Sequence, residues 1–156
     1  MKIISKSVND TINIGKRIAK NLKPADIICL FGELGSGKTI LTKGIALGLG
    51  IKGVNVNSPS FVLMRKYLGK FPFYHFDFYR LKIPQDILKL GYEEYLYDEA
   101  VSVIEWADRL RYLMPDEFLK IELSIIKMNS QRLLKFTARG RRYKELLEKI
   151  HEDIRD

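Results

Sequence analysis

Residues 32–39 read Gly32-Glu33-Leu34-Gly35-Ser36-Gly37-Lys38-Thr39, and they match the phosphate-binding pattern G-x-x-x-x-G-K-[ST] at every specified position. The apolar run 27–31 stands directly before them and has the length of a buried strand. After them, apolar and small residues recur at helical spacing over 40–48. Strand, glycine loop and helix follow one another in the order that this motif requires. The stretch therefore predicts a P-loop that binds a nucleoside triphosphate.

The residue types in this loop suit a triphosphate. Glycines let backbone N–H groups surround the β-phosphate without obstruction by a Cβ atom, and a helix that begins near Lys38 points the positive end of its dipole at the anion. Lys38 would reach the β- and γ-phosphate oxygens, and the Thr39 hydroxyl would ligate Mg²⁺. The predicted nucleotide contacts are Glu33, Leu34, Gly35, Ser36, Gly37, Lys38 and Thr39. The alternative is a glycine-rich turn that happens to carry a lysine, and the flanking elements disfavour it.

Length and composition are typical of a small globular protein. The chain has 156 residues, which is the size of one compact domain, so we expect a single P-loop ATPase domain over 1–156. No apolar run approaches the roughly 20 residues that span a bilayer, and the first residues lack the apolar core of a signal peptide. We therefore expect a soluble, cytoplasmic protein without a membrane partner. A lone cysteine, Cys29, lies in the run 27–31, which excludes disulfides and cysteine-ligated zinc within one chain.

The net charge of +8 predicts an anionic partner. Between residues 127 and 156 there are nine Lys and Arg against five Asp and Glu, so half of the excess positive charge lies in this region. Its densest part contains Arg139, Arg141, Arg142 and Lys144. Such a region fits a nucleic acid, but it equally fits an acidic protein or a role in solubility.

The remaining elements alternate in a way that predicts an α/β fold. We expect a three-layer, P-loop NTPase-like domain with a mostly parallel central sheet and added antiparallel hairpins. Helices are predicted around 14–22, 84–90, 92–97 and 143–154, a strand over 101–106, and hairpins from 61–68 with 71–81 and from 117–128 with 131–138.

A triphosphate site also needs acids that hold the water shell of Mg²⁺ and orient the attacking water. In the strand around 73–80, a period of two places His75, Asp77 and Tyr79 on one face. Glu105 ends the apolar run 101–106, and the carboxyl ends of parallel strands form the edge where α/β sheets bind ligands. A carboxylate in an apolar strand is costly unless a cation or hydrogen-bond donors satisfy it. Asp77 and Glu105 are therefore the predicted acids.

Each of these residues could instead have a purely structural role. Either acid could instead pair with Arg80 or a neighbouring lysine. His75 stands in an aromatic strand, where a lone histidine is predicted to be a hydrogen-bonded core residue rather than a catalytic one. Trp106 fits an exposed position beside the site or a core position. The turn 58–61 has two hydroxyl groups and fits a loop that senses the γ-phosphate.

Taken together, these segments resemble the TsaE (YjeE) family of small P-loop ATPases, which are required to make threonylcarbamoyladenosine in tRNA. Residues 32–39 resemble the family's G-[DE]-L-G-[AS]-G-K-T loop, 58–61 its S-P-T-[FY] turn, 74–81 its Y-H-F-D-x-Y-R-L strand and 104–106 its [IV]-E-W end. The last two are the specific signals. Ser60 departs from the usual threonine but keeps the hydroxyl.

The resemblance implies an ATPase that uses ATP and Mg²⁺, is weak alone, and acts on a complex of TsaB and TsaD. The transfer chemistry would belong to TsaD, and tRNA would be engaged indirectly, with direct contact left open. By motif, Lys38, Asp77 and Glu105 would be catalytic, and Thr39, Glu105 and Asp77 would serve the metal, with the acids able to exchange roles. Residues 7–11 resemble the family's base-contacting region.

Two other functions remain. A small-molecule P-loop kinase would share the loop but needs an arginine-bearing lid; Arg65 and Arg80 are available, yet no lid-like insertion is evident. A nucleotide-gated binding module would use ATP without requiring hydrolysis. A regulatory GTPase is disfavoured because neither D-x-x-G nor N-K-x-D occurs in the chain.

Overall fold

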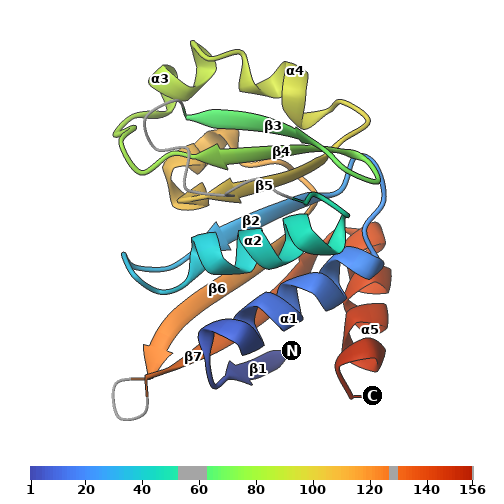
Figure 1. Cartoon of the computed structure of the whole chain (residues 1–156). Helices are drawn as coiled ribbons and strands as arrows, with labels where there is room; N and C mark the ends of the chain where they lie inside the picture. The colour runs from blue at the N-terminus through green and yellow to red at the C-terminus, as the bar shows by residue number, and fades with distance from the viewer. Residues whose placement is uncertain (53–62, 127–129, 156) are drawn as a thin grey trace.

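The computed structural model describes residues 1–52, 63–126 and 130–155. Its described strands form a seven-stranded sheet in the order β1-β7-β6-β2-β5-β4-β3 (Figure 1). The strands are β1 (Lys2–Ser5), β2 (Ile27–Phe31), β3 (Met64–Leu68), β4 (Pro72–Asp77), β5 (Val101–Glu105), β6 (Phe118–Ile126) and β7 (Gln131–Arg139). The helices are α1 (Val8–Lys20), α2 (Lys38–Gly48), α3 (Pro84–Leu88), α4 (Tyr92–Leu96), the 3₁₀ helix η1 (Ala107–Leu113) and α5 (Arg141–Arg155).

The centre of the sheet is parallel and its margins are antiparallel. Strands β6, β2, β5 and β4 run in the same direction, whereas β3, β7 and β1 each pair antiparallel with a neighbour. The predicted mixed α/β fold, parallel at its centre with antiparallel additions, is confirmed. In the register, Glu105 pairs with Leu30 of β2 on one side and with Asp77 of β4 on the other. The carboxyl ends of three parallel strands therefore meet at one edge.

Helices cover both faces of the sheet. One apolar cluster joins α1, α2 and α5 to β2, β5, β6 and β7, and a second joins α3, α4 and η1 to β2, β4 and β5. All five residues of β5 are buried, as expected for a central parallel strand with helices on both faces. Cys29 is buried in β2, as predicted. None of the described helices is long and apolar enough to cross a membrane.

The P-loop helix is fixed by close packing against α1 (Figure 1). A Cβ atom at Gly44 of α2 would lie 2.4 Å from the carbonyl oxygen of Ile12, and one at Gly15 of α1 would lie 2.7 Å from that of Leu41. Real Cβ atoms do not approach backbone oxygens so closely, so glycine at both positions lets the two helix backbones come together. This contact sets the position of the helix that follows the phosphate loop.

The C-terminal helix is anchored beneath β2. Arg142 donates two hydrogen bonds to the buried Asp26, with Nε–Oδ1 and Nη2–Oδ2 distances of 2.9 and 2.6 Å. The Tyr143 hydroxyl accepts a hydrogen bond from the backbone N–H of Ile27 at 2.7 Å. Burial raises the pKa of Tyr143 well above the ordinary tyrosine value. Arg142 therefore has a structural role, which removes it from the basic region that the sequence offered to a polyanion.

Several boundaries differ from prediction. The strand predicted over 71–81 ends at Asp77, because the Asp77 carboxylate accepts a hydrogen bond from the backbone N–H of Tyr79 and turns the chain. Tyr79 consequently lies beyond the strand rather than on its face. Neither β1 nor η1 was predicted. The strand β1 is short and owes its place to pairing with β7. The turn at 58–61 lies outside the described residues.

Candidate functional site

The loop before α2 has the backbone of a phosphate cradle. Gly32, Gly35 and Gly37 have positive φ angles of 145°, 78° and 105°, which only glycine adopts without strain. A Cβ at Gly32 would lie 2.4 Å from the backbone oxygen of Leu123 on β6 and 2.6 Å from the Ser36 hydroxyl. Gly37 is the N-cap residue of α2 and supplies no side-chain hydrogen bond to it, so the first N–H groups of the helix are left for an anion, as at anion sites at helix N-termini.

Lys38 folds back over this loop. Its ammonium group donates to the carbonyl oxygens of Gly32 and Glu33 at 2.7 and 2.9 Å and approaches the Ser36 hydroxyl at 3.4 Å. The same Nζ atom lies 4.1 Å from the centre of the Trp106 ring, within the range of a cation–π contact. Burial lowers the pKa of Lys38 below the ordinary lysine value, while the carboxylates of Glu105 and Asp77 act in the opposite direction.

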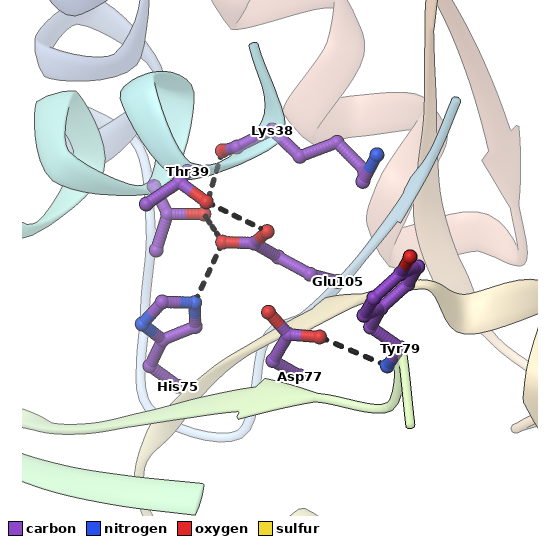
Figure 2. Close-up of polar contacts among 7 residues, drawn as sticks. Lys38, Thr39, His75, Asp77, Tyr79 and Glu105 are labelled. Atoms are coloured by element: carbon purple, nitrogen blue, oxygen red, sulfur yellow. Dashed lines mark hydrogen bonds and ion pairs between the residues drawn. The ribbon is translucent and has the colours of Figure 1, made fainter. Parts of the chain in front are cut away.

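Glu105 lies directly across from the start of α2 (Figure 2). The Thr39 hydroxyl donates to Glu105 Oε2 at 2.9 Å, and the Thr42 hydroxyl approaches Oε1 at 3.4 Å while it donates to the Lys38 carbonyl at 2.9 Å. Glu105 is 2% exposed. The structure thus joins the last residue of β5 to the P-loop threonine that the motif assigns to Mg²⁺.

His75 contacts the other side of the same carboxylate. Its Nε2 atom lies 2.7 Å from Glu105 Oε1, and its ring is fully buried. The sequence predicted a hydrogen-bonded core histidine, and His75 is buried and hydrogen-bonded. Its partner, however, is Glu105 of the candidate site (Figure 2).

Asp77 lies beside Glu105 at the same edge of the sheet. The two residues pair in register between β4 and β5, and Asp77 is 2% exposed. Its Oδ1 atom accepts the hydrogen bond from the Tyr79 N–H at 2.9 Å. The Asp77 and Glu105 carboxylates therefore end neighbouring strands, and Glu105 also meets the Thr39 hydroxyl (Figure 2).

A cleft of about 450 Å³ opens over these groups. It is lined by Leu34, Gly35, Gly37, Lys38, Thr39, Ile40, Asp77, Tyr79, Arg80, Glu105 and Trp106. Trp106 is half-buried: it lines the cleft and also packs against the second apolar cluster, so it falls between the exposed and core positions that the sequence left open. Leu34 is 70% exposed, so its contribution to a bound phosphate would come from its backbone.

A second hollow of about 120 Å³ lies on the α1 side of the loop. It is lined by Ser5, Ser7, Val8, Thr11, Gly35, Gly37, Ile40, Ser130 and Arg132. The Arg132 guanidinium donates to the Gly35 carbonyl at 3.3 Å. Sequence reasoning did not single out Arg132, because the contact depends on β7 beginning beside the loop.

The donor set fits a magnesium ion that is bound together with phosphate. The described residues contain no group of three or more His, Cys, Asp or Glu side chains that could hold a metal ion. Mg²⁺ is usually held by one or two carboxylates with substrate phosphates and water, rather than by a cage made only of protein groups. The Thr39 hydroxyl and the Glu105 carboxylate, joined at 2.9 Å, supply oxygen ligands of that kind.

All predicted site residues lie at this one edge of the sheet. Lys38, Thr39, Asp77 and Glu105 line the same cleft, and the loop residues 33–37 curve beside it. Thr42 was missed, although its spacing of three from Thr39 on a helix was a signal that both hydroxyls share a face.

Comparison with known proteins places the chain in one family. The family model "Threonylcarbamoyl adenosine biosynthesis protein TsaE" matches residues 5–134. The tRNA threonylcarbamoyladenosine biosynthesis protein TsaE of Bacillus subtilis is 40% identical over 150 residues, which cover 93% of this chain and 91% of the relative. The protein of the same name from Treponema pallidum is 36% identical over 126 residues, covering 81% and 93%. A crystal structure of Bacillus subtilis YdiB superposes with a TM-score of 0.85 at 35% identity, covering 97% of this chain and 94% of that one.

Proposed function

Because the chain belongs to the TsaE family, we propose that it is a Mg²⁺-dependent ATPase that acts in the biosynthesis of threonylcarbamoyladenosine in tRNA. The names of its relatives support the pathway. One contact supports the ATPase above all others, the hydrogen bond of 2.9 Å between Thr39 of the P-loop and Glu105 at the end of β5. It places a P-loop hydroxyl and a buried carboxylate close enough to serve as ligands of one metal ion.

The roles of the residues follow from their positions. The N–H groups at the start of α2 and the Lys38 ammonium group would hold the phosphates. Thr39 and Glu105 would hold Mg²⁺, which when bound neutralises charge on the β- and γ-phosphates. Asp77 would orient the attacking water, since its carboxylate lines the same cleft. It is the less suitable metal ligand of the two acids, because its Oδ1 atom already accepts a hydrogen bond from the Tyr79 N–H.

The smaller hollow is the proposed site of the nucleotide base. Ser7 and Thr11 of the region that resembles the family's base-contacting segment line it, together with Gly35 from the loop. A nucleotide whose phosphates follow the loop would place its base on this side. Arg132 would close the hollow from β7.

The proposed partners are TsaB and TsaD, with the transfer chemistry on TsaD. Indirect engagement of tRNA is the version that the surface supports better. Of the dense basic group, Arg142 is committed to the buried Asp26, which leaves one fewer charge for phosphates than the sequence suggested.

The decisive experiment measures Mg²⁺-dependent ATP hydrolysis by the purified protein, alone and with the TsaB–TsaD complex of the same source. Lys38→Ala serves as the blank, and Lys43→Ala on the same helix serves as the matched control, because Lys43 does not belong to the cleft lining. Stimulation by the partners in the wild type and in Lys43→Ala, absent in Lys38→Ala and with GTP, is the expected result. Nucleotide binding without any stimulation would instead favour the kinase or the nucleotide-gated module.

A further inference from the structure

We propose that His75 is a positioning residue for the metal ligand Glu105, and that it holds one carboxylate oxygen so that the other faces Thr39. This inference rests on the proposed function, because it concerns the acid assigned to Mg²⁺. It gives a role in the site to a residue that the sequence assigned to the core.

The backbone aims the histidine ring at the acid. In β4, side chains two residues apart share a face of the sheet, so His75 and Asp77 both point toward α2 (Figure 2). The ring is fully buried, and its Nε2 atom lies 2.7 Å from Glu105 Oε1. This is the length of a strong hydrogen bond between a ring nitrogen and a carboxylate.

The direction of this hydrogen bond follows from its partner. A carboxylate oxygen accepts hydrogen bonds, so the proton lies on Nε2 and histidine is the donor. In the described part of the chain, the other ring nitrogen, Nδ1, is buried and has no hydrogen-bond partner. A buried polar atom without a partner is destabilising, and β4 is otherwise rich in aromatic side chains that would fill the space without that cost. The hydrogen bond to Glu105 is therefore the feature that accounts for histidine here.

The contacts divide the carboxylate into two halves. Oε1 faces inward, where His75 donates to it and Thr42 approaches at 3.4 Å. Oε2 faces the loop, where Thr39 donates at 2.9 Å. The terminal torsion of a free glutamate is broad, so a donor fixed in the sheet selects the orientation that presents Oε2 to the loop. Changing such an outer partner of a metal ligand typically costs about 10- to 100-fold in metal affinity.

Two conservative variants separate positioning from packing. The side-chain amide nitrogen of glutamine falls near the place of Nε2, whereas that of asparagine falls near the place of Nδ1. The measurement is Mn²⁺ binding, by the loss of the free-ion EPR signal, to protein saturated with the non-hydrolysable analogue β,γ-imido-ATP. The affinity for the analogue in EDTA and the melting temperature are measured alongside, because a purely structural role would change these two as well.

We expect His75→Gln to bind Mn²⁺ within about threefold of the wild type and His75→Asn to bind it roughly 10- to 100-fold more weakly. Affinity for the metal-free analogue should stay unchanged in both. Should His75→Asn fail to fold, His75→Leu supplies the comparison without a donor, since leucine has a similar volume and suits the apolar surroundings.

Three results would overturn the inference. Wild-type Mn²⁺ affinity in a folded His75→Asn or His75→Leu would show that Glu105 needs no donor at this position. Equal losses of metal affinity, metal-free analogue affinity and melting temperature in all variants would show a general structural role. A wild-type protein that binds Mn²⁺ no more tightly than the free analogue does would refute the metal site of the proposed function itself, and this inference with it.

Discussion

Replacing Glu105 by glutamine should remove the metal-dependent part of nucleotide binding while the fold survives. Glutamine has the shape of glutamate, and its amide oxygen can still accept from His75 while its amide nitrogen meets the Thr39 hydroxyl, so both short contacts are kept. Each changes from a charge-assisted hydrogen bond of about 1.5–3 kcal/mol to a neutral one of about 0.5–1.5 kcal/mol. The Glu105 side chain is 2% exposed, so the variant also avoids the cost of keeping a charge away from water, and this gain offsets part of the loss. The net decrease in unfolding free energy should therefore stay below about 2 kcal/mol.

The effect on metal binding should be larger. Glutamine turns its N–H₂ group toward the loop, so the oxygen ligand is lost together with its charge. Removing a direct ligand should cost at least the upper end of the 10- to 100-fold range known for outer-shell partners, and a 100-fold loss corresponds to about 2.7 kcal/mol. We expect partner-stimulated ATP hydrolysis to fall by about 100-fold or more, while ATP affinity in EDTA changes by less than about threefold.

The assay compares ATP binding with Mg²⁺ and with EDTA, followed by turnover with the partner complex. Glu122→Gln is the matched control, because Glu122 pairs with Lys120 and Lys135 on β6 and β7 and does not line the cleft. A folded Glu105→Gln that keeps wild-type Mg²⁺-dependent affinity and turnover would refute the assignment of Glu105 to the metal. A matching loss in Glu122→Gln would show that the assay reports surface charge instead.

Lys38→Ala should weaken ATP binding by about 10- to 100-fold, the value of a charge-assisted hydrogen bond to phosphate; calorimetry that finds unchanged affinity would contradict the role of the loop. Gly32→Ala should destabilise the protein by roughly 1–3 kcal/mol and abolish nucleotide binding, because its Cβ would lie 2.4 Å from a backbone oxygen of β6. Gly50→Ala is the control for backbone strain alone, because Gly50 has a φ of 81° and nothing within 4 Å of its Cβ position. Equal effects of the two variants would show that the collision at Gly32 has no role. Asp26→Ala should lower the unfolding free energy by about 2–3 kcal/mol in urea denaturation, less than the 3–5 kcal/mol of a fully buried pair, because the Arg142 side chain is 24% exposed. An unchanged denaturation midpoint would mean that α5 is anchored by its apolar face.

Much of the fold followed from local pattern. The phosphate loop and its flanking elements could be predicted because glycines at fixed spacing and an apolar run act through the nearest neighbours in the chain. The strand 101–106 and the C-terminal helix were found in the same way. The short strand β1 was not predicted, because it forms by pairing with β7. The early end of β4 was not predicted either, because it depends on the turn at Asp77.

The sequence by itself determined which functional groups the site could use, namely the phosphate loop with Lys38 and Thr39, and two acids placed at the ends of apolar strands. It also determined the family, since the motifs that carry the resemblance are contiguous segments, and the resemblance is confirmed. Only the tertiary structure decided which groups meet. The order of β2, β5 and β4 brings Glu105 to Thr39 and Asp77, and it places His75 behind the carboxylate. These pairs are 28 to 66 positions apart in the chain, and they depend on strand order and register, which local spacing does not encode.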